Sequence, residues 1–291
     1  MSNIIGLIGL GAMGGSYATH LLKNGYEVNG LDPNNKSSND FTLKGGKILF
    51  NINELIAKSD VIILSLPTIL IFKSVISEIE ENYVRSNSKI LIDMNTISFE
   101  DKLEAKIVLD RLNINMIDAP VSGTGAQAKT KDLVVMSSGL EENINSCQDI
   151  FLSFARQNIY VGEFGNGIKF KLLANLLVTV HNTVTAEALL LGQKVGLDEN
   201  KIYEVLNAGA ASSVMLDKRM PLMIKKDYEP ATASMTIFLK DIEVIRQFIK
   251  SNNVISPTFE AAAKVYDEAK LNVPMTYDTA AVFEQLKINN K

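Results

Sequence analysis

The sequence predicts a two-domain protein, with an α/β Rossmann domain at the N-terminal end and an all-α domain at the C-terminal end. Three observations support this fold class. Short apolar segments alternate with helical ones up to about residue 162, a glycine-rich turn follows the first apolar segment, and helical periodicity alone continues from 171 to 286. We place the domains at residues 1–163 and 164–291, joined by a long interdomain helix.

Composition and charge are those of an ordinary soluble globular protein. The 291 residues are 46% hydrophobic and 21% charged, and the formal net charge of −4 argues against a nucleic-acid partner. Cys147 is the single cysteine, which excludes an intramolecular disulfide and a cysteine-based zinc site, and no metal is expected. The chain begins without a basic signal-peptide region, and no apolar run reaches the ~18 residues of a membrane span. We therefore expect a cytoplasmic protein without a membrane partner.

The first predicted strand, Asn3–Ile8, is followed by a glycine-rich turn. A helix over Ser16–Asn24 and a strand over Glu27–Leu31 come next. Asp32 then stands 23 residues after Gly9, and such an acid accepts hydrogen bonds from an adenosine ribose while the glycines admit a pyrophosphate. The turn consists of Gly9, Leu10, Gly11, Ala12, Met13 and Gly14. We predict that it binds NAD, because Asp32 repels a 2′-phosphate; NADP stays open because Lys36 is close by in the chain.

Strands and helices continue to alternate through the rest of the first domain. The predicted strands are Lys47–Phe50, Asp60–Leu66, Lys89–Met94, Ile114–Ala119, Leu133–Ser137 and Asn158–Gly162. The predicted helices are Asn51–Lys58, Ile69–Val84, Ser98–Asn113 and Asn143–Gln157. The carboxyl ends of parallel strands share one sheet edge, where such folds bind ligands. We therefore expect the turns at 66–68, 95–96 and 120–125 to cluster there.

One of these turns carries Ser122, Gly123 and Thr124 directly after a strand. Its backbone N–H groups and two hydroxyls are suited to holding a small carboxylate. A turn that caps the following helix explains the same residues equally well. The spacing does not distinguish the two interpretations.

The second domain is helical in pattern. Its predicted helices are Lys171–Val195, Asp198–Ala208, Met235–Ser251, Pro257–Lys270 and Thr276–Leu286, and Pro221 and Pro230 are interpreted as boundaries. The first helix opens at Gly165-Asn166-Gly167 and carries Lys171 and Asn175 four residues apart, on one face. The run from 176 to 191 is apolar nearly all round, as in a buried helix. Because lysine is almost never buried without a partner, Lys171 needs an explanation.

Four motifs together resemble the β-hydroxyacid dehydrogenase family, which includes the 3-hydroxyisobutyrate dehydrogenases, over essentially the whole chain. They are Gly9–Gly14, Asp118-Ala119-Pro120-Val121-Ser122-Gly123, Gly165-x-Gly167-x-x-x-Lys171-x-x-x-Asn175 and Lys240-Asp241. The resemblance implies that Lys171 is the catalytic lysine and that Asn175 acts beside it. It further implies a substrate-binding turn at Ser122, Gly123 and Thr124, and cofactor contacts from Leu66, Pro67, Thr96 and Lys240.

The reaction that the resemblance implies is hydride transfer between a nicotinamide cofactor and a short β-hydroxy acid or its semialdehyde. Oxidising the alcohol needs a base for the hydroxyl proton. Lys171 is such a base only if its pKa falls from about 10.4 towards 7–8, which burial and a like charge from Lys240 both favour. Asn175, one turn on, is suited to bind the same oxygen or the substrate carboxylate. The alternatives are a snorkelling surface lysine at 171 and a solvated pair at Lys240-Asp241.

Departures from the family pattern leave the substrate open. Thr124 replaces the second glycine of Ser-Gly-Gly, Ala174 stands where many relatives have another asparagine, and Ile71 replaces a cofactor-contacting asparagine. An imine reductase of the same fold is one alternative, although such relatives tend to replace the lysine. A catalytically silent dinucleotide-binding module is another. The apolar helices exceed what one sheet can cover, so we also expect a homodimer or homotetramer.

Overall fold

The computed structural model describes residues 4–83 and 88–291, and the chain forms two compact units that divide after Lys171. The division falls inside helix α9 (Asn166–Lys194), whereas the predicted boundary at 163/164 lies just before this helix. Asn3 and Val84, which end two of the predicted elements, lie outside the described residues.

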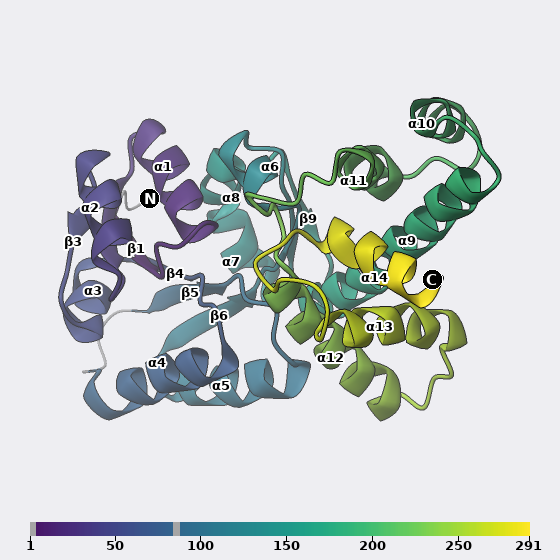
Figure 1. Ribbon diagram of the computed structural model, residues 1–291. Coiled ribbons are helices and arrows are strands. Elements are labelled where there is room, and N and C mark those ends of the chain that lie inside the picture. Colours follow the sequence, from purple (N-terminus) through teal and green to yellow (C-terminus); the bar gives the residue numbers. More distant parts are fainter. Residues whose placement is uncertain (1–3, 84–87) are drawn as a thin grey trace. The chain divides into compact units, whose positions relative to one another are not determined.

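Unit 1 is built on a six-stranded parallel sheet with the order β3-β2-β1-β4-β5-β6 (Figure 1). Its strands are β1 (Ile4–Ile8), β2 (Glu27–Leu31), β3 (Lys47–Ile48), β4 (Val61–Leu64), β5 (Lys89–Asp93) and β6 (Ile114–Asp118). The strand order reverses between β1 and β4, which is where sheets of this kind bind dinucleotides. All six strands fall at predicted positions, and the predicted Rossmann fold is confirmed.

Helices cover both faces of this sheet (Figure 1). Helices α1 (Gly14–Lys23) and α8 (Gln148–Phe154) bury Tyr17 and Phe154 on one face, with ring centroids 4.7 Å apart. Helices α3 (Ile52–Lys58), α4 (Ile69–Asn82) and α5 (Phe99–Arg111) pack on the other face. Side chains alternate along β4, with Ile63 in the first core and Ile62 in the second. The sheet is thus buried on both sides, which explains its continuous apolar strands.

The segments around Phe41 and Cys147 differ from the prediction. Helix α2 (Asn35–Leu43) was not predicted. Phe41 is the one buried side chain of this polar segment, so the segment has only a weak apolar periodicity. Asn34 caps α2 by accepting a hydrogen bond from Ser37 N–H at 3.1 Å. The predicted helix over Asn143–Gln157 is two short helices, α7 (Glu141–Ser146) and α8, which meet at Cys147.

A second, three-stranded sheet continues unit 1 in the order β7-β8-β9. It consists of β7 (Val121–Ser122), β8 (Val134–Ser137) and β9 (Gln157–Tyr160), and helix α6 (Gly125–Lys129) follows β7. A β-bridge between Asp118 and Ser138 connects the ends of β6 and β8. This bridge brings two polar side chains to the point where α9 begins.

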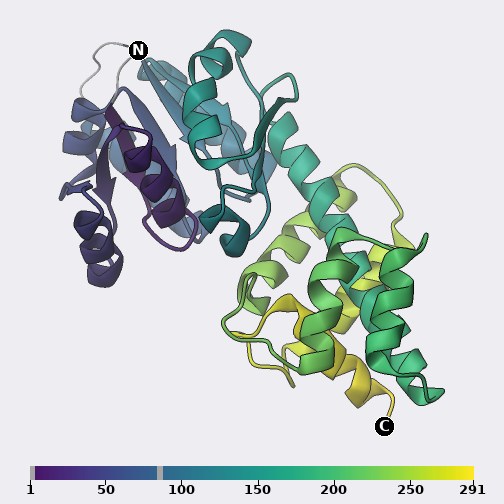
Figure 2. The ribbon, with the colours of Figure 1, turned by 90° about the horizontal axis from the view of Figure 1, so that it is seen from above.

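Unit 2 is helical throughout, as predicted (Figure 2). Besides the second part of α9 it contains α10 (Glu199–Ala208), α11 (Val214–Lys225), α12 (Met235–Ser251), α13 (Pro257–Ala269), a 3-10 turn (Thr279–Ala281) and α14 (Val282–Asn289). Asn182 of α9 is buried and donates to the Tyr266 hydroxyl at 3.2 Å, so α9 and α13 share a polar contact within the core. None of the described helices is long and apolar enough to span a membrane.

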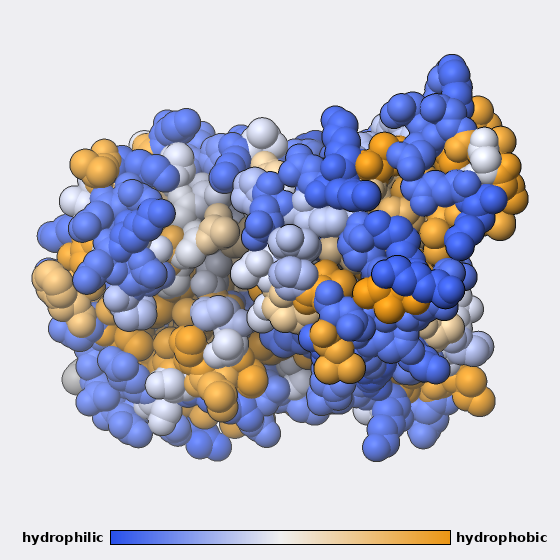
Figure 3. All heavy atoms as spheres, viewed as in Figure 1, coloured by the Kyte–Doolittle hydropathy of each residue, from blue (hydrophilic) through white to orange (hydrophobic). Residues whose placement is uncertain are grey.

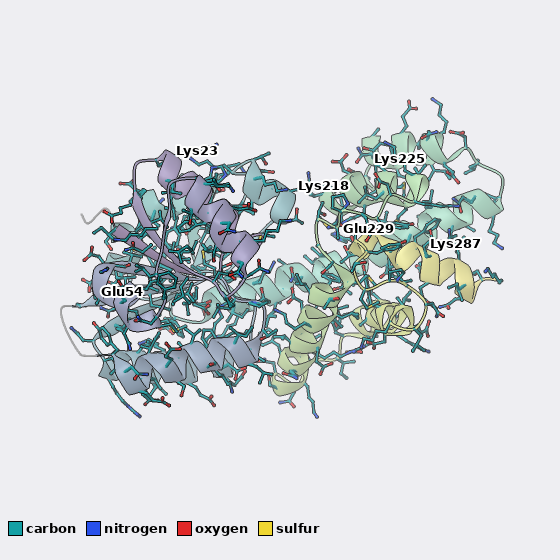
Figure 4. The ribbon with its side chains drawn as sticks, turned by 60° about the vertical axis from the view of Figure 1, so that its left-hand side comes forward. Lys23, Glu54, Lys218, Lys225, Glu229 and Lys287 are labelled. Atoms are coloured by element: carbon teal, nitrogen blue, oxygen red, sulfur yellow. The ribbon has the colours of Figure 1, made fainter. Side chains whose placement is uncertain are left out.

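Helix α11 corrects the interpretation of Pro221, which lies inside the helix rather than at a boundary. Pro221 lacks the N–H that would bond to the Asp217 carbonyl, at a cost of about 3 kcal/mol. Burial of Leu216, Met220 and Met223 outweighs this cost, at about 1.5–3 kcal/mol for each side chain. Lys218 and Lys225 are exposed on α11 (Figure 4), whereas Arg219 is buried and pairs with Asp278 at 2.8 Å.

Candidate active site

The glycine-rich turn between β1 and α1 has two tightly packed glycines and one open one. Gly9 has a φ of +95°, and a Cβ there would lie 2.2 Å from the Ser65 carbonyl oxygen. A Cβ at Gly14 would lie 1.9 Å from the Gly9 carbonyl oxygen, whereas one at Gly11 would meet no protein atom within 4 Å. The turn therefore leaves space at Gly11, before the N-terminus of α1, and this space fits a cofactor phosphate.

Asp32 follows β2 and is bonded to the same turn. Its Oδ2 accepts from Leu10 N–H at 2.6 Å, and its Oδ1 accepts from Asn34 N–H at 2.8 Å. Each carboxylate oxygen has a second lone pair for another donor. The half-buried carboxylate is thus held beside the glycine turn in a position that suits a ribose.

The turns after β4 and β5 are joined by a buried amide. Asn95 Oδ1 accepts from Leu66 N–H at 2.6 Å, and Asn95 Nδ2 donates to Asp93 Oδ1 at 2.5 Å. Pro67 and Thr96 are the next residues in the two turns. These two turns therefore meet at the carboxyl edge of the sheet, as predicted.

The beginning of α9 is anchored at the end of β6 by two buried side chains. Asp118 Oδ2 accepts from Ile168 N–H at 2.8 Å. The Ser138 hydroxyl oxygen accepts from Gly165 N–H at 3.2 Å and from Gly167 N–H at 3.0 Å. A Cβ at Gly167 would lie 2.5 Å from the Met136 carbonyl oxygen, so a glycine is needed for this close approach. The helix thus starts at the carboxyl edge of the sheet.

Lys171 and Asn175 lie on the continuous helix α9, four residues apart and on one face. In unit 2, Asn175 is buried and its Nδ2 donates to Asp241 Oδ2 at 2.9 Å. A carboxylate only accepts hydrogen bonds, so Asp241 determines which end of the amide points towards it. Lys240 Nζ lies 3.3 Å from Asp241 Oδ1. Lys171 belongs to unit 1 and Lys240 to unit 2, so the expected electrostatic effect of Lys240 on Lys171 stays a prediction.

The Ser122 turn has features of a helix-capping turn and of a carboxylate-binding turn. Thr124 N–H donates to Gln127 Oε1 at 3.1 Å, which is a capping contact at the start of α6. Ser122 is exposed at the end of β7, and Gly123 has a φ of +132°. The backbone of Thr124 thus serves the helix, while a substrate contact from Ser122 and Gly123 stays a prediction.

Asp93, Lys102 and Ser138 were not predicted as site residues, although all three are buried beside these groups. Lys102 stands in the polar run Glu100-Asp101-Lys102, which is typical of an exposed helix surface. Its one sequence signal is position, because Lys102, Ala105 and Leu109 recur at helical spacing on the buried face of α5.

Comparison with known proteins relates both halves of the chain to one family. Residues 4–162 match the NAD binding domain of 6-phosphogluconate dehydrogenase, and residues 165–286 match the NAD-binding domain of NADP-dependent 3-hydroxyisobutyrate dehydrogenase. L-threonate dehydrogenase of Cupriavidus necator is 30% identical over 270 residues, which cover 91% of this chain and 90% of that protein. 2-(Hydroxymethyl)glutarate dehydrogenase of Eubacterium barkeri is 29% identical over 90% of this chain and 88% of its own.

The same fold is found in a solved structure. The Mycobacterium tuberculosis 3-hydroxyisobutyrate dehydrogenase with L-serine has a TM-score of 0.89 at 24% identity, over 99% of this chain and 100% of that one. The chain therefore belongs to the β-hydroxyacid dehydrogenase family. It is an NAD(P)-dependent oxidoreductase of that family.

Proposed function

We propose that this protein oxidises a short β-hydroxy acid, or reduces the matching semialdehyde, with Lys171 as the general acid/base. The relatives named above act, by their names, on threonate and on 2-(hydroxymethyl)glutarate, which are both hydroxy acids. One observation carries the assignment of Lys171. Ile168 N–H is bonded to Asp118 at the carboxyl end of β6, and Lys171 follows three residues later, ~4.5 Å further along the helix. This supports a lysine at the same sheet edge as the glycine-rich turn.

The chain's own residues divide the chemistry among them. The glycine-rich turn would hold NAD(P), which would supply the hydride donor or acceptor for the substrate carbon. Neutral Lys171 takes the substrate's hydroxyl proton during oxidation, and protonated Lys171 returns a proton to the carbonyl oxygen during reduction. Asn175, oriented by Asp241, hydrogen-bonds the same oxygen or the substrate carboxylate. Ser122, with Gly123 and Thr124, binds the carboxylate.

NAD is the cofactor in this proposal, and NADP is the alternative. The Asp32 carboxylate beside the glycine turn supports this choice, because its negative charge repels a 2′-phosphate and its oxygens accept from ribose hydroxyls. Pro67 and Leu66 after β4, Thr96 after β5 and Lys240 on α12 complete the proposed cofactor contacts.

The test is a screen of short hydroxy acids and their semialdehydes, with NAD and NADP in parallel, on the wild type and on Lys171→Ala. We expect turnover to fall about 10²–10⁴-fold in the variant, because the proton acceptor is gone, while cofactor affinity measured by calorimetry stays near normal. Lys169→Ala is the matched control, because Lys169 is on the same helix as Lys171 but its Nζ lies over the Phe99 ring of α5, 4.8 Å from the ring centre. Undiminished turnover in Lys171→Ala contradicts the proposal. Turnover of a cyclic imine alone favours the imine reductase, and no cofactor turnover at all favours a silent binding module.

We further propose a homodimer or homotetramer. Leu177, Val184 and Leu191 are exposed on α9 at intervals of seven residues, and Val195 and Leu197 are exposed just after the helix. Figure 3 shows hydrophobic surface at the upper right, where α9 ends and α10 begins. Light scattering should give two or four times the chain mass of 31.9 kDa, and a mass of one chain contradicts the proposal. A cytoplasmic location is proposed as well, in keeping with a single, buried cysteine at 147.

A further inference from the structure

Lys102 is a completely buried lysine between two completely buried aspartates. Its Nζ lies 2.7 Å from Asp93 Oδ2 and 2.7 Å from Asp118 Oδ1, and all three side chains are 0% exposed. Asp93 and Asp118 are the last residues of β5 and β6 and are paired in register. Two carboxylates at such neighbouring positions repel each other, so the ammonium group between them holds the strand ends together.

One branch of this network leads to the beginning of α9. Asp118 uses one oxygen for Lys102 and the other for Ile168 N–H and for the Ser138 hydroxyl, which lies 3.1 Å away. Ser138 in turn accepts from the N–H groups of Gly165 and Gly167. Three backbone N–H groups at the start of α9 are therefore bound, directly or through Ser138, to the carboxylate that Lys102 holds.

The other branch leads to the turn after β4. Asp93 Oδ1 accepts from the side chain of Asn95, and it also accepts from Asn95 N–H at 3.1 Å. Asn95 Oδ1 binds Leu66 N–H, the first residue of the Leu66-Pro67 turn. Lys102 Nζ thus binds the two carboxylates that fix α9 and this turn.

The charge of this network matches its position. Burial raises the pKa of Asp93, and the Lys102 ammonium opposes this rise. Asp118 also faces the positive N-terminal end of α9. Burial by itself lowers the pKa of Lys102, but Asp118 and Asp93 together outweigh burial and raise it, so the lysine stays charged. Buried ion pairs add little net stability compared with well-packed apolar residues, so stability alone is a weak reason for this arrangement.

We propose that Lys102 is a positioning residue of the active site, which sets the beginning of α9 ahead of Lys171 through Asp118 and the Leu66-Pro67 cofactor turn through Asp93. The part that concerns Lys171 rests on the function proposed above. The part that concerns the position of the α9 start and of the Leu66-Pro67 turn holds whether or not Lys171 has the proposed function.

The test compares Lys102→Met with Lys89→Met. Lys89 is also buried, at the opposite end of β5, where its Nζ donates to the Ser59 carbonyl at 2.6 Å. We expect Lys102→Met to lower kcat about 10- to 100-fold and to weaken cofactor binding, because both site elements shift. Lys89→Met should lower the melting temperature and leave both values near wild type.

Single-branch variants separate the two effects. Asp118→Asn should lower kcat with cofactor affinity retained, and Asp93→Asn should weaken cofactor affinity with a smaller effect on kcat at saturating cofactor. Each variant removes one of the two carboxylates and leaves the other beside Lys102. These variants can therefore test the proposal even if Lys102→Met does not fold. Wild-type kcat and affinity in all folded variants, or equal losses in Lys89→Met, would overturn the proposal.

Hydrogen exchange supplies a readout that needs no activity. The amides of Gly165, Gly167 and Ile168 should exchange faster in Lys102→Met and in Asp118→Asn than in the wild type or in Lys89→Met. Unchanged exchange overturns the positioning role. Faster exchange supports Lys102 as the positioning residue whatever the activity of Lys171→Ala. If Lys171→Ala is fully active, it is the proposed function of Lys171 that has failed.

Discussion

At the glycine-rich turn, the consequence of one added methyl group depends on which glycine receives it. Gly9 and Gly14 face backbone oxygens at 2.2 and 1.9 Å from a built Cβ, so they are required by the protein itself. Gly11 has no protein atom within 4 Å of that position, so the fold does not require it. In the function proposed above, it is the cofactor that requires a glycine there, because its pyrophosphate would approach the backbone at that point.

Gly11→Ala should therefore affect cofactor binding, whereas Gly14→Ala should affect the stability of the fold. In Gly11→Ala we expect a melting temperature close to wild type but a cofactor affinity at least about tenfold weaker, ~1.4 kcal/mol, because the methyl group occupies the phosphate space. In Gly14→Ala we expect a clearly lower melting temperature, because the Gly9 carbonyl must move. Thermal unfolding and calorimetric titration with NAD measure both. Normal cofactor binding by Gly11→Ala contradicts the assignment of this turn.

At the scale of elements, α9 and α12 are joined by the buried pair of Asn175 and Asp241. The carboxylate accepts from the amide nitrogen, which leaves the Asn175 oxygen pointing away from it. Lys240, the preceding residue on α12, contacts the other carboxylate oxygen. One aspartate thus aligns two of the predicted site residues, which explains why Lys240 and Asp241 occur as a pair.

Replacing Asp241 by asparagine tests this alignment. An amide at 241 both donates and accepts, so Asn175 loses its single preferred orientation and Lys240 loses its counter-charge. We expect kcat to fall about tenfold or more, in line with a misplaced catalytic group, while the circular dichroism spectrum stays that of the wild type. Glu243→Gln on the same helix is the control, since Glu243 is exposed and pairs only loosely with Arg246 at 3.8 Å. Equal kinetics in both variants would contradict the orienting role of Asp241.

At the scale of the whole molecule, the hydrophobic cores contain protonated groups that resist ionisation. Burial raises the pKa of the Cys147 thiol from 9.0 to about 11. Burial also raises the pKa of Tyr17 in unit 1 and of Tyr266 in unit 2 above the ordinary 10.0. The folded chain keeps these protons to a higher pH than the unfolded chain does, so unfolding releases protons in this range and stability falls as pH rises.

We therefore expect these three groups to leave the free energy of unfolding nearly constant at pH values well below 9 and to lower it as the pH rises through 9 and above. Between pH 8 and pH 10 the loss should be on the order of 1–2 kcal/mol, with Cys147 contributing the largest part. Urea unfolding at several pH values measures the loss, and Cys147→Ala should show a shallower decrease. A stability that rises between pH 8 and pH 10 would contradict the burial of these groups.

The sequence by itself determined the elements whose signals are local. The strands of the large sheet, the glycine turn with Asp32, and the shared face of Lys171 and Asn175 all follow from spacing along the chain, because strand and helix periods act over a few residues. Helices α2 and α11 have no such local signal. Helix α2 buries too little apolar surface to show a period, and α11 contains Pro221, whose cost is met by burial that only the packed structure reveals.

The tertiary structure alone decided how polar residues meet. Lys102, Asp93 and Asp118 come together because β5 and β6 pair in register and α5 turns one face inwards, and no local pattern encodes that register. Asn175 and Asp241 are 66 residues apart, so their contact depends on the packing of two helices. Local periodicity specifies which residues form an element, whereas the partner of a buried charge depends on the long-range packing of several elements at once.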